Sequence, residues 1–350
     1  MTAINAARVA RAHRPRMLEH STQGHRAPLF TLQWHLTHAC DLDCLHCYDR
    51  TKLAAPTLDQ ALGVLDQMDA FCEAKGVTPS TCFSGGNPFL YKPFFDVYAS
   101  AVERGHRVSI LGNPVSDEQL DRLCAIRKPR YFQVSLEGLE AHNDHIRGAG
   151  FYERVMEFLP KLRARGIQAV VMTTLTADNR DEVIPLARVL RDRADRYAYN
   201  RLAQVGSGAA LAHLDAEAYG RFMIEWLHES QTNRTLGQKD NLLNIFKHEL
   251  GMKLGGGCTG FGCGAAFNFV ALLPDGAVHA CRKFPSSIGN LRERSLLEIY
   301  DGADAEAYRR GCTACDGCAI RKRCGGCMAV SHGAGLDPFT DRDPHCFMYA

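Results

Sequence analysis

Between residues 28 and 204, short apolar runs alternate with stretches in which apolar residues recur every three or four positions. The runs predict β-strands, and the stretches between them predict amphipathic α-helices. Thr57 with Gln60, and Ser116 with Gln119, have the spacing of a capping box and predict two helix starts. The strands are expected at residues 30–36, up to 83, 108–111, 131–136, 169–175 and 197–203.

Six alternations of strand and helix imply parallel strands joined by right-handed crossovers. Six units are too few for a closed barrel of eight, so the expected fold is α/β, with a partial (β/α)6 barrel that is similar to an incomplete TIM barrel. In such a barrel the functional groups lie at the C-terminal ends of the strands.

The pattern changes after the predicted barrel. Two helices are expected at residues 215–254, and after residue 255 glycine and cysteine dominate while apolar periodicity fades. A segment of that kind buries too little apolar surface to fold alone, so we expect it to fold around metal. The expected division is a basic N-terminal tail at 1–27, a barrel at 28–214, a helical connector at 215–254 and a cysteine-rich domain at 255–350.

Composition narrows the class of protein. The chain has 350 residues, of which 46% are apolar and 23% charged, and a net charge of +2. These values are typical of a globular protein and give no nucleic-acid footprint. No apolar run approaches the roughly 18 residues of a membrane span. The basic tail is expected to be loosely docked or disordered, and an organelle-targeting peptide is the alternative.

The 15 cysteines are odd in number and fall mostly in two clusters, at residues 40–47 and 258–346. An odd number excludes a fully paired disulfide framework, and short fixed spacings favour metal ligation in a reducing, cytoplasmic compartment. Cys40, Cys44 and Cys47 follow the first predicted strand. Three such thiolates can hold three irons of a [4Fe–4S] cluster and leave the fourth iron open. Spacing alone also leaves open a zinc site completed by His38 or His46.

The C-x3-C-x2-C pattern after the first strand of a βα repeat resembles the radical S-adenosylmethionine (SAM) enzymes. Residues 84–88, which read SGGNP, are similar to the GGEP motif of that family, with an amide in place of the usual Glu. Residues 135–138 (SLEG) and 142–148 (HNDHIRG) resemble its SLDG…HDxxRG stretch. The resemblance implies SAM contacts at these positions: Tyr48, Gly85, Gly86, Asn87, Ser135 and Arg147.

The same resemblance implies a reaction. The cluster cleaves SAM reductively to methionine and a 5′-deoxyadenosyl radical, and this radical removes a hydrogen atom from a substrate. An amide oxygen at Asn87 can still accept a hydrogen bond from the amino group of SAM, without charge assistance. The guanidinium of Arg147 suits the SAM carboxylate because it can donate two parallel hydrogen bonds.

The C-terminal cysteines include a C-x2-C-x5-C-x2-C run at residues 315–327 and a late Cys346. This arrangement resembles the SPASM extension of radical SAM enzymes, which holds two auxiliary [4Fe–4S] clusters. The resemblance implies two interleaved ligand sets: Cys258, Cys263, Cys281 and Cys327 for the first, and Cys315, Cys318, Cys324 and Cys346 for the second.

With the N-terminal cysteines, these sets imply three [4Fe–4S] clusters and leave Cys72, Cys82 and Cys124 as buried free thiols. Cys312 stays open as a replacement for one ligand, because its spacing also fits part of a ferredoxin run. Zinc is the alternative for the whole domain.

SPASM enzymes mostly modify peptides, so the resemblance implies a maturase that acts on a ribosomally made precursor peptide and forms a thioether or carbon–carbon cross-link, or a heterocycle. Arg282 stands where the sulfatase-activating branch has an Asp base, so formylglycine formation is not expected. Arg282 and Lys283 are candidate substrate contacts for an acidic leader or a thiolate; neutralisation of cluster charge is the alternative. Residues 257–290 look like a subgroup linked to Cys-rich or selenocysteine-containing "selenobiotic" precursors.

The implied partners are the precursor peptide and a reductant such as flavodoxin or ferredoxin. The 39 residues before Cys40 are too few for a fused leader-binding domain, so either a separate leader-binding protein or direct recognition of the leader is expected. No nucleic acid or membrane is expected. The sequence does not mark a catalytic side chain. Two other functions stay open: a radical SAM enzyme for a small-molecule cofactor intermediate, and a non-catalytic iron–sulfur electron carrier.

Overall fold

The computed structural model describes residues 17–19, 25–49 and 51–348. Most of the expected basic tail lies outside these ranges. Its described end forms a short antiparallel pair, β1 (Leu18–Glu19) with β2 (Arg26–Ala27), in which one apolar side chain of each strand is buried. Within the described ranges, no helix is both long and apolar enough to cross a lipid bilayer.

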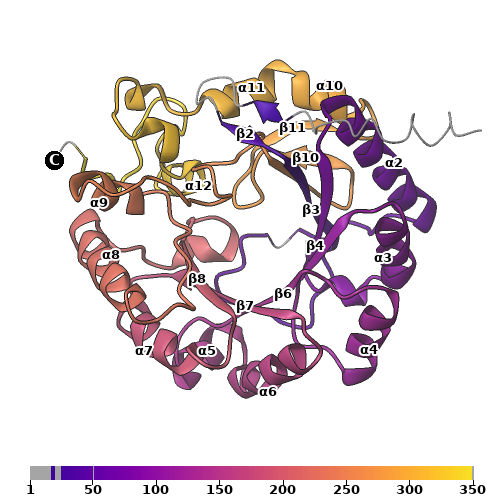
Figure 1. Cartoon of the computed structure of the whole chain (residues 1–350), viewed down its shortest axis with the longest axis horizontal. Helices are drawn as coiled ribbons and strands as arrows, with labels where there is room; N and C mark the ends of the chain where they lie inside the picture. The colour runs from indigo at the N-terminus through magenta and orange to yellow at the C-terminus, as the bar shows by residue number, and fades with distance from the viewer. Residues whose placement is uncertain (1–16, 20–24, 50, 349–350) are drawn as a thin grey trace, which may run out of the picture.

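Six parallel strands, β3 to β8, lie side by side in chain order, as the alternating pattern predicts. They curve into an incomplete ring with helices on its outside, and the C-terminal part of the chain occupies the remaining arc (Figure 1). The predicted partial barrel is therefore confirmed. The strands are β3 (Leu29–Thr37), β4 (Thr78–Gly85), β5 (Arg107–Leu111), β6 (Tyr131–Ser135), β7 (Gln168–Leu175) and β8 (Arg196–Arg201).

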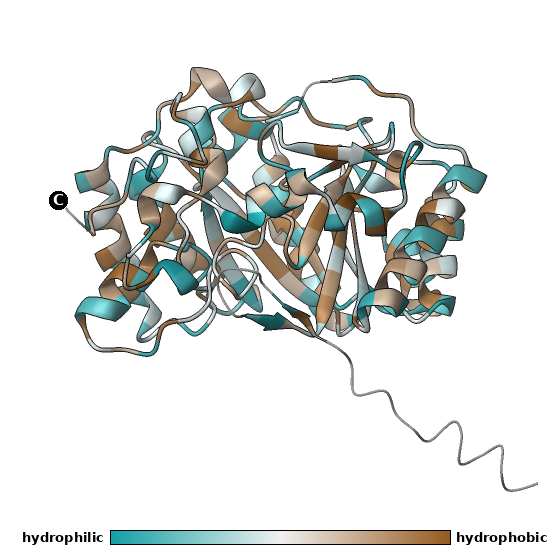
Figure 2. Ribbon diagram, turned by 90° about the horizontal axis from the view of Figure 1, so that it is seen from above, coloured by the Kyte–Doolittle hydropathy of each residue, from teal (hydrophilic) through white to brown (hydrophobic). Residues whose placement is uncertain are grey.

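The helices pack an apolar face on these strands. In α2 (Leu58–Lys75), Leu65, Met68 and Phe71 are fully buried at the spacing of one helix face. Both capping boxes expected from the sequence are formed. Apolar residues concentrate in the central strands, with polar residues interspersed along the surrounding helices (Figure 2). The other barrel helices are α3 (Phe94–Glu103), α4 (Asp117–Ile126), α5 (Glu140–Arg147), α6 (Phe151–Ala164) and α7 (Arg180–Leu190).

Two helices, α8 (Ala216–Ser230) and α9 (Leu243–Glu249), follow the barrel, and the chain then extends the same sheet. β9 (Phe269–Leu272) pairs in parallel with β3, and β10 (Ala277–His279) and β11 (Ser287–Asn290) continue it in antiparallel fashion. Consequently, the sheet has nine strands and runs from the cysteine-rich region into the barrel.

The cysteine-rich region shares an apolar core with the barrel. Tyr300 of α10 (Leu296–Asp301) packs against Phe30 and Phe71, with ring centroids 5.6 and 5.0 Å apart. After α11 (Ala303–Arg310) come two short 3-10 turns, η3 (Thr313–Cys315) and η4 (Arg321–Arg323), and the helix α12 (Met328–Gly333). Most of the remaining cysteines lie in the loops between and after these elements. The fading periodicity after residue 255 therefore hides a packed segment from β9 to α10, and regular structure is sparse before β9 and beyond α11.

Candidate functional site

The three N-terminal cysteines lie on the loop that leaves the C-terminal end of β3. The backbone N–H of Cys47 donates to the carbonyl of Cys44 at 3.2 Å. Burial raises the pKa of Cys44 to about 11, and the adjacent Cys40 and Cys47 thiols act in the same direction. The three thiols therefore converge, and they must lose protons when a metal binds.

A glycine pair after β4 lets this loop approach the sheet closely. A Cβ on Gly85 would lie 2.2 Å from the carbonyl oxygen of Thr37, and one on Gly86 would lie 2.2 Å from that of Ala39. The N–H groups of Gly86 and Asn87 donate to these two carbonyls at 2.8 Å. Because only glycine fits here, the pair fixes the chain that leads into the first cysteine. Its contact with SAM stays a prediction.

Asn87 turns its amide toward Asp41. Its Nδ2 donates to Asp41 Oδ1 at 2.9 Å and its Oδ1 accepts from the N–H of Phe89. Asn113 Nδ2 donates to the same Asp41 oxygen at 2.6 Å and lies 3.8 Å from Cys40 Sγ. Burial favours the protonated carboxyl, but the two amide donors hold the pKa of Asp41 below its usual range. Asp41 and Asn113 are site residues that no sequence motif indicated.

Arg147 is paired with a buried acid. Its Nε donates to Glu137 Oε1 at 2.9 Å, and His46 Nε2 lies 2.9 Å from the same oxygen. Burial alone would raise the pKa of Glu137, but His46 and Arg147 lower it to about 2. Arg147 Nη1 also lies 3.7 Å from Cys44 Sγ. The guanidinium expected on the SAM carboxylate thus contacts a cysteine thiol, and its role toward SAM stays a prediction.

Glu137 is a further residue of the candidate site, and the sequence motifs assign it no role. It directly follows Ser135 and Leu136 at the end of β6, and only 1% of its surface is exposed. An acid placed directly after a buried strand, inside the SLEG stretch, was the available signal. Ser135 ends β6 at the edge of the sheet where the cysteine loop lies, as the parallel fold requires.

Tyr48 connects the two cysteine regions. Its hydroxyl lies 3.4 Å from His35 Nε2, and the guanidinium of Arg282 lies 5.8 Å from the centre of its ring. Burial raises the pKa of Tyr48 to about 12. Because Tyr48 follows Cys47 and Arg282 follows Cys281, the N-terminal loop and the C-terminal cysteines border the same space.

The C-terminal cysteines gather in two groups. Cys258, Cys281 and Cys327 all lie close enough to Cys263 to raise the pKa of its thiol, although burial is the larger cause. The second group lines one pocket: Cys315, Cys318, Cys324 and Cys346. These groups coincide with the expected ligand sets, while ligation itself stays a prediction.

Cys312 lies beside the second group. Its thiol donates to the carbonyl of Asp341 at 3.0 Å, and with Cys263 and Cys315 it lines a neighbouring pocket. None of the 15 cysteines, all of which lie within the described residues, is paired in a disulfide. Because its thiol is buried and already hydrogen-bonded, Cys312 fits the role of a cysteine that binds no cluster. Its position beside Cys315 leaves open that it replaces one ligand of the second set.

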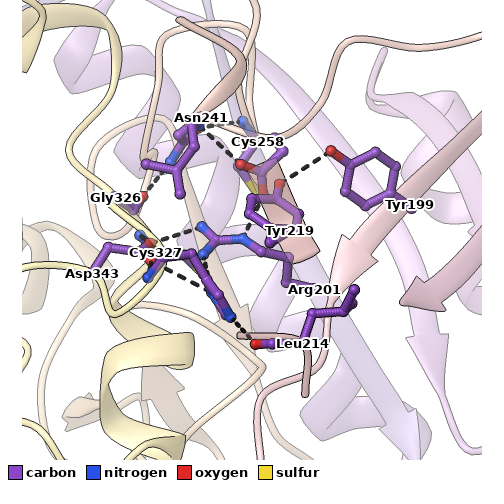
Figure 3. A network of polar contacts seen from close by, with 12 residues as sticks. Tyr199, Arg201, Leu214, Tyr219, Asn241, Cys258, Gly326, Cys327 and Asp343 are labelled. Atoms are coloured by element: carbon purple, nitrogen blue, oxygen red, sulfur yellow. Dashed lines mark hydrogen bonds and ion pairs between the residues drawn. The ribbon is translucent and has the colours of Figure 1, made fainter. Parts of the chain in front are cut away.

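Side-chain oxygens hold the backbone around these cysteines (Figure 3). Asn241 Oδ1 accepts from the N–H of Cys258 at 3.0 Å, and Asp343 Oδ2 accepts from that of Cys327 at 2.8 Å. Asp343 is in turn bound by Arg201 Nη1 at 2.7 Å. Because Arg201 ends β8, this buried ion pair fastens the C-terminal cysteines to the barrel.

Three cations face the first C-terminal group. Lys239, Arg282 and Lys283 interact electrostatically with Cys258 or Cys281, and within the described residues no ion pair joins any of the three to a carboxylate. Burial lowers the pKa of Lys239 to about 8, the neighbouring Arg282 and Lys283 act in the same direction, and Cys258 opposes them. The space beside Cys258 and Cys281 is therefore electropositive and suits thiolates or an anionic substrate group.

The donor sets fit iron–sulfur clusters. Each of the three groups consists of converging thiols, which are the ligands that such clusters take. The N–H donors of Arg147 and Asn113 near two N-terminal sulfurs match the hydrogen bonding that tunes a cluster. His38, one expected alternative ligand for zinc, contacts Asp49 and Thr51 instead.

Comparison with known proteins finds one family model that matches each cysteine region. A family model described as "Radical SAM superfamily" matches residues 34–190, and one described as "SPASM: Iron-sulfur cluster-binding domain" matches residues 263–328. Mycofactocin maturase MftC of Mycolicibacterium smegmatis is 28% identical, over 95% of this chain and 86% of its own length. AdoMet-dependent heme synthase of Methanosarcina barkeri is 26% identical, over 90% of this chain and 95% of its own.

A solved structure shares the fold. Streptococcus suis SuiB bound to its precursor peptide SuiA has a TM-score of 0.69 at 19% identity, over 91% of this chain and 76% of SuiB. The likeness extends from the barrel through the cysteine-rich region, so the two matched families form one continuous architecture.

Proposed function

This chain is an enzyme of the radical SAM superfamily that carries a SPASM domain, and we propose that it acts as a maturase on a ribosomally made precursor peptide. When bound, the N-terminal cluster supplies the electron that cleaves SAM to methionine and a 5′-deoxyadenosyl radical, which removes a hydrogen atom from the substrate. Support for a peptide comes from the similarity to mycofactocin maturase over nearly the whole chain.

We assign three [4Fe–4S] clusters, which corresponds to about 12 Fe per chain. Cys40, Cys44 and Cys47 would hold the first, and Arg147 and Asn113 would hydrogen-bond to its sulfur ligands. The expected C-terminal sets would hold the other two. For SAM, the assigned contacts are Tyr48, Gly85, Gly86, Asn87, Ser135 and Arg147.

The observation that carries the proposal is the contact between Tyr48 and Arg282, with 5.8 Å between the guanidinium and the ring centre. A substrate placed there touches both the N-terminal loop and the residues beside Cys281. The cations Arg282, Lys283 and Lys239 would hold a carboxylate or thiolate of the peptide at this position. Neutralisation of thiolate charge is the competing role for these cations, and the variants below separate the two.

We further propose that the product is a cross-link, a thioether or carbon–carbon bond, or a heterocycle, in a Cys-rich precursor. The assigned partners are a flavodoxin or ferredoxin reductant and a separate leader-binding protein. Arg282 beside Cys281, in place of an acid, supports this choice over formylglycine formation.

Co-expression with a short Cys-rich precursor, followed by mass spectrometry, tests the proposal. We expect a modified peptide that is absent with the variant C40A/C44A/C47A. Arg282→Gln should reduce peptide modification while SAM cleavage persists, if the cation contacts substrate. Equal loss of iron and product in Arg282→Gln would instead assign it to cluster charge. SAM cleavage without any peptide dependence would contradict the maturase function.

A second function is a radical SAM enzyme for a small molecule. The similarity to AdoMet-dependent heme synthase over 90% of this chain favours it. The same electropositive space would suit the carboxylates of a porphyrin-type substrate. Incubation of the reconstituted enzyme with SAM, reductant and an iron porphyrin that carries propionates would show loss of carboxylate in that case.

A further inference from the structure

Two histidines and an aspartate beside the N-terminal cysteine loop have converging ligand atoms. His35, His38 and Asp49 each offer one atom, and these atoms lie within 4.8 Å of one another. His35 lies on β3 and is 1% exposed, and the side chain of His38 is 8% exposed. None of the three is assigned to a cluster or to SAM.

His38 has the hydrogen bonds of a metal ligand. Its Nδ1 lies 2.8 Å from the carbonyl oxygen of Thr51. Because a carbonyl only accepts, Nδ1 carries the proton in this contact, and in the neutral ring a lone pair then remains on Nε2. That Nε2 is buried and makes no hydrogen bond. A histidine that binds a metal typically donates its other ring N–H to a backbone carbonyl or a carboxylate in this way.

Asp49 is oriented in a matching way. Its Oδ1 accepts from the N–H of Thr51 at 2.9 Å and from Thr51 Oγ1 at 2.6 Å. Its Oδ2 lies 3.3 Å from the bare Nε2 of His38. Two lone-pair atoms at this distance repel each other unless a positive charge lies between them. A proton on Nε2 is the alternative to a metal ion, whereas a metal ion would in addition use the ligand atom that His35 offers at the same point.

The charges and the donor atoms at this position restrict which metal ion can bind. The guanidinium of Arg282 lies over Tyr48, whose hydroxyl contacts His35, and its positive charge opposes a weakly bound cation. Asp49 is the one carboxylate of the triad, whereas Ca²⁺ prefers an all-oxygen set and Mg²⁺ keeps waters and carboxylates. Two neutral imidazoles and one carboxylate are ligands that Zn²⁺ and Fe²⁺ prefer.

We propose that His35, His38 and Asp49 bind a divalent transition-metal ion, Zn²⁺ or Fe²⁺, separate from the cysteine-bound iron. Three protein ligands leave a coordination position open. His38 precedes Cys40 and Asp49 follows Cys47, so the ion ties both ends of the cysteine loop to β3. This site does not depend on the identity of the substrate.

The test uses the anaerobically reconstituted holoenzyme, whose cysteines are occupied by iron. It is titrated with Zn²⁺, and zinc and iron are counted by mass spectrometry. We expect one zinc per chain beyond the iron, and a loss of zinc affinity of about 10- to 100-fold in His38→Ala and in Asp49→Asn, at unchanged iron. His142→Ala is the matched control, because His142 also has a buried Nε2 without a partner but lies on α5.

X-ray absorption at the zinc edge separates this site from zinc on cysteines. Nitrogen and oxygen ligands lie at about 2.0–2.1 Å, and sulfur lies at about 2.3 Å. A sulfur shell, no zinc uptake, or full uptake in both variants would overturn the proposal. Asp49→Asn decides if His38→Ala is unstable, because the amide keeps the hydrogen bonds to Thr51. Loss of iron together with zinc in both variants would also overturn it, because the residues would then only support the cysteine loop.

Discussion

The two cysteine regions are held by their surroundings in opposite ways. Around the N-terminal loop, side-chain N–H groups reach toward sulfur atoms: Arg147 Nη1 lies 3.7 Å from Cys44 Sγ, and Asn113 Nδ2 lies 3.8 Å from Cys40 Sγ. Asn113 lies just after β5, and Arg147 is the last residue of α5, the helix that follows β6. The barrel therefore supplies polar groups that act on the thiols themselves.

In the C-terminal region, side-chain oxygens bind the backbone N–H groups of cysteines. Asn241, Ser286 and Asp343 accept from the N–H groups of Cys258, Cys281 and Cys327, respectively. A donor to sulfur stabilises a thiolate and changes cluster potential, whereas an acceptor from the backbone fixes position. Backbone N–H groups donate to sulfur in the C-terminal region as well, as Gly326 N does to Cys324 Sγ at 3.5 Å, so the difference lies in the side chains. We infer that side chains tune the sulfurs of the first region and fix the backbone of the second.

The largest effect is expected from removing the N-terminal ligands. C40A/C44A/C47A should abolish 5′-deoxyadenosine formation and leave about eight of about 12 Fe, because the other ligand sets lie elsewhere. C281A/C327A should instead keep SAM cleavage and lose the peptide product. Iron counts and chromatography of the nucleoside check both. Cleavage that survives in the triple variant would refute the assignment, and stoichiometric zinc with under about 4 Fe would refute iron in the C-terminal region.

A large loss of stability is expected at Arg201. R201M leaves Asp240 and Asp343 buried without their cation, which costs about 3–5 kcal/mol in free energy of unfolding. Lys161→Met, which breaks an exposed pair with Asp117, should cost under about 1 kcal/mol. Urea unfolding measures both. A small effect of R201M would mean that the ion pair does not fasten the cysteine region to β8.

Apolar periodicity predicts the barrel, and cysteine spacing predicts how the cysteines group. Neither predicts which polar side chains contact the cysteines. The strands and both capping boxes follow from local patterns. The pairing of β9 with β3 joins segments far apart in the chain, and no local pattern encodes it. Likewise, Asn113 meets Asp41 and Cys40 only after the strand ends are aligned in the sheet. Glu137 was visible as an acid after a strand, yet its pairing with Arg147 required the fold.

The next largest effect, on the rate of SAM cleavage, is expected when Glu137 is substituted. E137Q removes the charge that holds Arg147 and His46, so we expect SAM cleavage to fall by about 10- to 100-fold at unchanged iron. E182Q is the control, because Glu182 binds the neighbouring backbone at Leu139 N but contacts no cysteine. Loss of iron in E137Q would show that Glu137 holds the cysteine loop in place instead of tuning it. This result would contradict the contrast drawn between the two cysteine regions.

Glu137 also gives a pH dependence with a defined sign. Its pKa is lowered from 4.5 to about 2 in the folded chain. The carboxylate therefore stabilises the fold above about pH 4.5, and this stability is lost as the pH falls toward 2. We expect the wild type to lose about 2 kcal/mol more than E137Q between pH 7 and 3. Urea unfolding of the iron-free chains at both pH values checks this, and parallel losses would contradict it.

The smallest expected effect compares two asparagines directly. Asn113 acts on a sulfur, and Asn241 acts on a backbone N–H. N113A should slow SAM cleavage by about 5-fold, which corresponds to one hydrogen bond of about 1 kcal/mol, and keep all iron. N241A should lose auxiliary iron and keep SAM cleavage. Asn233→Ala, which removes an equally buried amide away from the cysteines, controls for general destabilisation.

Iron counts and the potential of the N-terminal cluster distinguish the outcomes of this pair. A shifted potential in N113A with unchanged potential in N241A is expected, because only Asn113 reaches a sulfur of that loop. If N113A loses iron and N241A does not, then the N-terminal surroundings position the thiols and the contrast between the two regions is reversed. Equal losses in N113A, N241A and N233A would assign all three amides to the stability of the chain.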